Sequence, residues 1–179
     1  MRWLLWIGWL LPMVAGAKPD STYVTYAKTY TLKGDSAQLL QRTKEFVQNN
    51  RQLFTYTFSY GKPSGLNGID TAEHGFYKIN GDTVFAHTVW LYVGDRNSKC
   101  DVLHGDVRFV VKEHTVETTL CNVKYYQYIN TKDGYQLQKQ GYYKDLDICK
   151  HCTTAGIKLG EIVNNNFNSI TRGLYKSFR

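Results

Sequence analysis

The sequence has only three prolines among its 179 residues, and like charges nowhere gather into a run. Proline interrupts strand ladders, so its scarcity beside 14 tyrosines and eight phenylalanines favours long strands whose rings pack on a sheet face. The positive charges, with a formal net charge of +7, are scattered along the chain. They suit an acidic partner or simply keep the protein in solution, and without a basic run nucleic acid is not expected as a partner.

The familiar catalytic patterns are also missing: Gly-x-Ser-x-Gly, the phosphate-binding loop and His-Glu-x-x-His. His104 and Asp106 alternate with Arg108 onto one face of a predicted strand, where a hydrolase could use them. A solvated sheet face usually carries such residues without any catalytic role, and we expect His74 and His87 to be ordinary as well. We therefore predict no catalytic residues, no metal site and no cofactor, and we favour a non-enzymatic protein.

The N-terminal residues have the pattern of a removable secretory signal. Met1 and Arg2 give a positive start, residues 3–14 are apolar, and small residues precede a cleavage position after Ala17. The apolar run is too short to span a bilayer, which takes about 20 residues. We expect a signal peptide over residues 1–17 and a single exported domain over residues 18–179, located in the periplasm, cell envelope or extracellular space. No transmembrane segment is expected in the mature chain.

Two segments have the periodicity of amphipathic helices. Asp35 or Ser36 can cap a helix over residues 35–50, with Gln38 placed as in a capping box. A second helix is predicted over residues 154–175. Its apolar stripe consists of Leu159, Ile162, Val163, Phe167, Ile170 and Leu174.

The rest of the chain is predicted to form strands and turns. Asn80-Gly81 is a strong hairpin signal, because this turn needs residues that tolerate positive φ. Residues 61–70, rich in glycine, are the best candidate for a ligand-facing loop. Strands are predicted at residues 22–33, 53–60, 75–79, 83–93, 101–112, 115–129 and 135–142.

One hairpin allows its register to be predicted. If Lys112 faces Thr115, an apolar face forms and Cys121 lies opposite Asp106. Cys100 would then face Gln127, about 20 Å from Cys121 at ~3.3 Å per strand residue, which disfavours a bridge between them. The apolar pairs are Val111 with Val116, Phe109 with Thr118, and Val107 with Leu120.

This order of elements predicts an α+β fold: an antiparallel β-meander sheet with two helices packed on one face. Residues 35–50, 84–93, 107–111 and 122–126 carry the clearest part of this pattern. With these segments, the chain resembles a domain of unknown function with a TATA-binding-protein-like fold, found in exported Bacteroidetes proteins. The resemblance spans about residues 28–175 and implies no catalytic residues. The same order also resembles a helix-grip fold, in which a long C-terminal helix closes a curved sheet over an apolar cavity.

The cysteines allow several readings. Cys149 and Cys152, spaced as C-x-x-C beside Lys150 and His151, could act as a redox dithiol. In an oxidising compartment they could equally form a structural disulfide, with each other or with Cys100. A zinc site built from all four cysteines is poorly supported, because only one half has the C-x-x-C form. We favour the local Cys149–Cys152 bridge.

The functional prediction is an exported, non-enzymatic binding or structural domain that acts through its sheet or the loop at residues 61–70. Its partner would be a protein, a polysaccharide or a small apolar ligand. Candidate ligand-binding residues share one face of a predicted strand: Phe54, Tyr56, Phe58 and Tyr60. Two alternatives stay open, a thiol-disulfide oxidoreductase using Cys149 and Cys152, and a carrier with a cavity between the sheet and the C-terminal helix.

Overall fold

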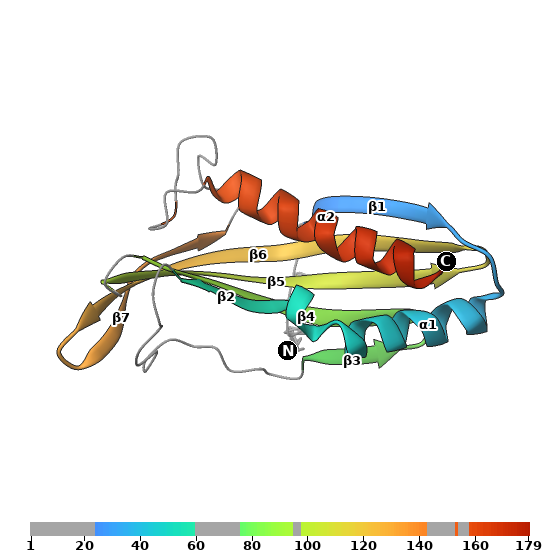
Figure 1. Ribbon diagram of the computed structural model, residues 1–179, viewed down its shortest axis with the longest axis horizontal. Helices are drawn as coiled ribbons and strands as arrows, with labels where there is room; N and C mark the ends of the chain where they lie inside the picture. Colours follow the sequence, from blue (N-terminus) through green and yellow to red (C-terminus); the bar gives the residue numbers. More distant parts are fainter. Residues whose placement is uncertain (1–23, 60–75, 95–97, 143–152, 154–157) are drawn as a thin grey trace, which may run out of the picture.

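The computed structural model describes residues 24–59, 76–94, 98–142, 153 and 158–179. Within these residues the chain forms a seven-stranded sheet and two α-helices, which lie together on one face of the sheet (Figure 1). The predicted α+β class is therefore confirmed. The strands are β1 (Val24–Thr31), β2 (Thr55–Ser59), β3 (Tyr77–Asn80), β4 (Thr83–Val93), β5 (Lys99–Lys112), β6 (Thr115–Thr131) and β7 (Gly134–Tyr142). The helices are α1 (Ser36–Asn49), the short 3-10 helix η1 (Arg51–Leu53) and α2 (Leu159–Ser177).

Three long strands make the centre of the sheet, and short strands share its edges. The order is β1-β6-β5-β4-β2, with β7 also paired to β6 and β3 also paired to β4. One pair departs from the predicted antiparallel arrangement, because β2 runs parallel to β4. The reason is the brief connection through η1: the chain continues in the direction of α1 instead of turning back, and this direction is that of β4 (Figure 1).

Aromatic side chains fill the space between the helices and the sheet. Asp35 caps α1 as predicted, its carboxylate accepting a 2.8 Å hydrogen bond from the Gln38 N–H. Phe46 of α1 packs edge-on against two sheet-side rings, Phe54 and Phe109. Along α2, the stacked pairs are Tyr26 with Phe167 and Tyr30 with Tyr175.

Gly173 lies where α2 approaches α1 and η1 closely. A Cβ atom at this position would lie 3.1 Å from side-chain carbons of both Leu53 and Phe46. Glycine is a poor helix former, so its use in the middle of α2 is explained by this contact. In the described part of the chain no helix is long and apolar enough to cross a membrane.

The predicted register of β5 and β6 is correct for half of the hairpin. Pairing runs from Lys112 opposite Thr115 to Asp106 opposite Cys121. A β-bulge then adds one residue to β6, with Asn122 in the left-handed conformation at φ 54°. Beyond this bulge the prediction is wrong by one residue, and Cys100 faces Tyr128.

Gly105 lies opposite the bulge and has little room around its Cα. A Cβ there would be 3.1 Å from the Thr88 hydroxyl oxygen and 3.3 Å from carbons of Leu120 and Val123. Asparagine tolerates the left-handed region better than other non-glycine residues, which is why Asn122 can serve as the extra residue.

The core contains one hydroxyl without a hydrogen bond among the described residues. Thr118 is fully buried opposite Phe109, and its Oγ1 has no partner there. An unpaired buried hydroxyl costs free energy, so Thr118→Val should raise the free energy of unfolding by about 1 kcal/mol. Chemical denaturation would measure the change.

Thr88→Val is the matched control for Thr118→Val. Thr88 is also fully buried in the sheet, but its hydroxyl donates a 3.0 Å hydrogen bond to the Gly105 carbonyl. We expect this control to be destabilised. Equal effects of the two substitutions would show that the Thr118 hydroxyl is satisfied in solution.

Candidate functional site

Three of the four predicted ligand-binding residues, Phe54, Tyr56 and Phe58, belong to the helix-side core or pack against it. Phe54 is fully buried and packs edge-on against Phe46, Phe76 and Phe109, so it is a core residue. Phe58 packs on Tyr92, and Tyr60 lies outside the described residues.

Tyr56 takes part in a small hydrogen-bonded group beside α2. Its hydroxyl bonds that of Tyr92, which also accepts a 3.2 Å hydrogen bond from the Asn166 amide. Burial, assisted by the Tyr56 hydrogen bond, raises the pKa of Tyr92 well above its ordinary value. Tyr92 is therefore a neutral hydrogen-bonding group, and through its bonds to Tyr56 and Asn166 it joins β2 and β4 to α2.

A second polar group on this face depends on the bulge. Asp101 is fully buried and accepts hydrogen bonds from the Tyr125 hydroxyl at 2.6 Å and from the Gln127 amide at 3.1 Å. Gln127 can reach it because the shifted register places Gln127 directly opposite Asp101. Burial and the Asp101 hydrogen bond raise the pKa of Tyr125, so this phenol stays neutral.

The two described cysteines are buried free thiols. Cys121 lies opposite Asp106, whereas Cys100 lies near the far end of β5. Burial, with a contribution from the charge of Asp101, raises the pKa of Cys100 to about 12, which makes this thiol a poor nucleophile. Because Cys100 is free, it forms no bridge in this structure. Cys149 and Cys152 lie outside the described residues, and their local bridge stays a prediction.

The face of the sheet opposite the helices, called the open face below, is buried at one end, where Val93, Cys100 and Val102 belong to a second hydrophobic cluster. Beside this cluster the face carries a series of polar side chains. Strand alternation puts His87, His104 and Asp106 on this face, since their neighbours Ala86, Leu103 and Val107 belong to the helix-side core. The His87 Nδ1 lies 3.0 Å from an Asp106 carboxylate oxygen. The His87 Nε2 lies 3.2 Å from the His104 Nδ1. Hence one imidazole connects the carboxylate with the second imidazole.

Asp106 determines which ring nitrogen of His87 carries the proton. A carboxylate accepts hydrogen bonds only, so it holds a proton on the His87 Nδ1. The Asn122 amide, placed by the bulge, donates to the other Asp106 oxygen at 3.3 Å. The His87 hydrogen bond is the main reason that the pKa of Asp106 lies below its ordinary value; Asn122 and the charge of Lys78 act in the same direction, while burial opposes them.

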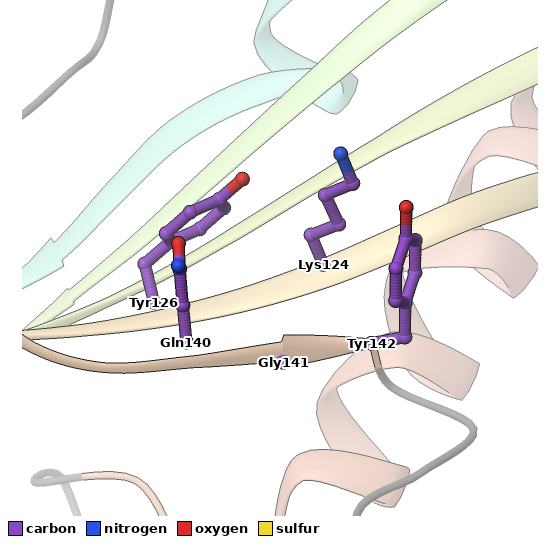
Figure 2. A pocket seen from close by; sticks show the side chains of 5 residues that line it. All are labelled: Lys124, Tyr126, Gln140, Gly141 and Tyr142. Atoms are coloured by element: carbon purple, nitrogen blue, oxygen red, sulfur yellow. The ribbon is translucent and has the colours of Figure 1, made fainter.

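A pocket of about 270 Å³ lies beside these polar side chains, between β6 and β7. Figure 2 shows the rings of Tyr126 and Tyr142 projecting from the two strands with Lys124 between them. Gln140 and Gly141 complete the lining. The His104 ring meets Tyr126 edge-on, with 5.2 Å between ring centroids, so the polar side chains and the pocket are in direct contact.

Sequence reasoning recognised part of this site. His104 and Asp106 were placed together on one face, but His87 was treated as ordinary. The pairing of β4 with β5 sets His87 opposite Asp106, and a register for that hairpin would have revealed the contact. The pocket depends on the bulge, which the sequence pattern did not indicate. Within the described segments, no three His, Cys, Asp or Glu side chains group as a ready metal centre.

No protein-family model and no curated protein matches the sequence. The structure is similar to a TBP-like protein from Parabacteroides distasonis ATCC 8503, with a TM-score of 0.50 and 10% sequence identity, covering 88% of this chain and 96% of that one. It is also similar to a DUF4468 family protein from Bacteroides ovatus ATCC 8483, with a TM-score of 0.50 and 7% identity, covering 90% and 88% of the two chains. These likenesses confirm the predicted TBP-like fold.

The contact between His87 and Asp106 predicts the direction in which the pKa of Asp106 is shifted. Its carboxyl should titrate below the ordinary value of about 3.9, and His87→Val should raise this pKa, because the largest lowering contribution is lost. A depressed carboxyl pKa stabilises the fold above the unfolded pKa, and this stability is lost as the pH falls through the folded pKa. Carboxyl carbon chemical shifts followed over an acid titration give both values. An unchanged Asp106 midpoint in the variant would contradict the assigned contact.

Proposed function

We propose that this protein is an exported, non-enzymatic binding domain whose open face binds an acidic polysaccharide. The observation that carries the proposal is the pocket in which Tyr126, Tyr142 and Lys124 project together from neighbouring strands (Figure 2). The fold itself implies no activity, because the similar structures are described only as TBP-like and as a DUF4468 family protein.

The lining residues suit a sugar ring that carries an acidic group. A tyrosine offers an apolar ring face and a polar hydroxyl at its edge. The Gln140 amide supplies both donors and an acceptor, and the Lys124 ammonium supplies donors and a positive charge. The volume of about 270 Å³ lies slightly below the usual range for small-molecule pockets, which fits a single ring better than a large cofactor.

The setting of the pocket also favours an acidic ligand. The Lys124 Nζ lies 5.2 Å from the centroid of the Tyr142 ring, so the charge is held at the pocket and not swung into solvent. The chain as a whole carries a formal net charge of +7. Both features raise the local concentration of an anionic polymer.

The two alternative functions gain nothing from the described residues. The thiols of the oxidoreductase hypothesis, Cys149 and Cys152, lie outside them. The carrier hypothesis needs a space between α2 and the sheet, whereas rings of α2 stack there on Tyr26 and Tyr30 of β1.

Binding of an acidic polysaccharide such as polygalacturonate is the direct test. Tyr126→Ala should weaken binding by at least about tenfold, or about 1.4 kcal/mol, because the ring platform is lost. Tyr126→Phe keeps the ring and should retain most of the affinity. Isothermal titration calorimetry of the purified protein measures both.

Lysine variants separate a specific contact from general charge. Lys124→Ala should weaken binding, whereas Lys112→Ala, which removes an equal charge paired with Glu117 at 3.4 Å, should not. Added salt should reduce the affinity of the parent protein. Equal losses in the two lysine variants would mean that only net charge attracts the polymer, and the pocket would not be the binding site.

Export is tested separately. Secretion from the native host should yield a chain that begins at Lys18, because the pattern ending at Ala17 directs cleavage there. N-terminal sequencing of the protein recovered outside the cytoplasm gives the answer. Recovered protein that begins at Met1 would overturn the proposed processing.

A further inference from the structure

We propose that the His87 Nε2 and the His104 Nδ1 together bind one divalent transition-metal ion of the copper, nickel and zinc class. Asp106 would hold His87 in position from the opposite side of its ring. This site lies next to the sugar pocket but uses none of its lining residues, so either proposal can fail without the other.

The distance between the two nitrogens fits a shared metal ion. Two nitrogens bound to one tetrahedral ion at about 2.0–2.1 Å each lie about 3.3 Å apart. The His87 Nε2 and the His104 Nδ1 are 3.2 Å apart. The two nitrogens therefore already have the separation that a shared ion requires, and both rings must turn from their hydrogen-bonded orientation until their lone pairs converge on the ion.

The protonation state of His87 also suits a ligand. Asp106 keeps a proton on the Nδ1, so in the neutral ring the Nε2 carries the lone pair that a metal requires. A carboxylate on the far nitrogen of a ligating histidine is the usual arrangement in metal sites, where it fixes the ring and makes the ligand more basic. Asn122 holds the carboxylate in turn.

His104 can adopt the matching state. In the neutral pair it donates its Nδ1 proton to His87; for metal binding the proton moves to the His104 Nε2 and leaves the Nδ1 as a ligand. The ion is bound by two neutral imidazoles, and water would fill its remaining positions. Imidazole suits copper, nickel and zinc rather than magnesium or calcium.

Basic side chains border the site, and the negative charge of Asp106 offsets them; the charge of Lys78 already acts on this carboxylate. The Lys78 Nζ is held 5.2 Å from the centroid of the Phe85 ring, and the Lys124 Nζ is held over the Tyr142 ring. Arg108 is exposed. The side chain of His87 is 29% exposed and that of Asp106 is 44% exposed, so an ion can reach the site from solvent.

The experiment is an isothermal titration of Cu²⁺, Ni²⁺ and Zn²⁺ into the purified Cys149→Ser/Cys152→Ser protein. This background removes thiols that could bind the same ions beside His151. We expect one ion per chain, with Cu²⁺ bound most tightly, as the Irving–Williams order requires. His87→Asn and His104→Asn should each weaken Cu²⁺ binding at least about tenfold, and Asp106→Asn by about ten- to a hundredfold.

His114→Asn is the matched control. His114 is an exposed histidine in the β5–β6 turn at φ 58°, a conformation that asparagine tolerates. This variant should bind Cu²⁺ as the background protein does. Circular dichroism of every variant confirms that the fold is retained.

A second readout does not depend on substitution. In histidine-labelled protein, Zn²⁺ should shift the ring resonances of His87 and His104 and leave those of His114 in place. Rings of His87 and His104 that do not move at saturating Zn²⁺ would overturn the proposal. Unchanged Cu²⁺ affinity in folded His87→Asn and His104→Asn would overturn it as well, by placing the ion at another residue such as His74.

Discussion

The β-bulge at Asn122 decides which side chains of β6 face the open surface. Strand residues alternate between faces, so one extra residue exchanges the faces of every residue that follows. Before the bulge the even-numbered residues Val116 and Leu120 point to the helices; after it the odd-numbered residues Val123 and Tyr125 do. Lys124 and Tyr126 are thereby placed on the open face, where they line the pocket. Without the extra residue they would point into the core.

The same bulge has consequences on both faces of the sheet. On the helix side it brings Gln127 opposite the buried Asp101, which needs hydrogen-bond donors to be tolerated there. On the open side it positions the Asn122 amide against Asp106. A single backbone irregularity thus provides donors for two carboxylates. The bulge is therefore a structural element of this sheet and not an irregularity without consequence. The residue opposite it is glycine, and a side chain at Gly105 would have no space.

Periodicity was enough to predict the fold but not the site. The stripes of α1 and α2 and the alternation in β5 and β6 each depend on nearest neighbours, and the structure confirms them, for the β5–β6 hairpin as far as the bulge. The parallel pairing of β2 depends on the direction in which the chain leaves α1, which composition does not reveal. The contact of His87 with Asp106 depends on register between strands, and the pocket depends on the bulge. Local sequence patterns therefore predicted the helices and the sheet. The polar side chains of the site are brought together by strand register and by the bulge, which local patterns do not reveal.

The edge of β6 explains why the pocket occurs where it does. β1 covers this edge opposite residues 115–121, and β7 takes over opposite residues 124–131. The break between the two short strands coincides with the bulge, and Tyr142 and Gln140 of β7 pair there with Lys124 and Tyr126. A continuous edge strand would extend the sheet past this point as a regular surface. Because two strands share the edge, the last side chains of β7 lie beside those of β6 and near the histidines. This place therefore brings together apolar rings, a positive charge and imidazoles.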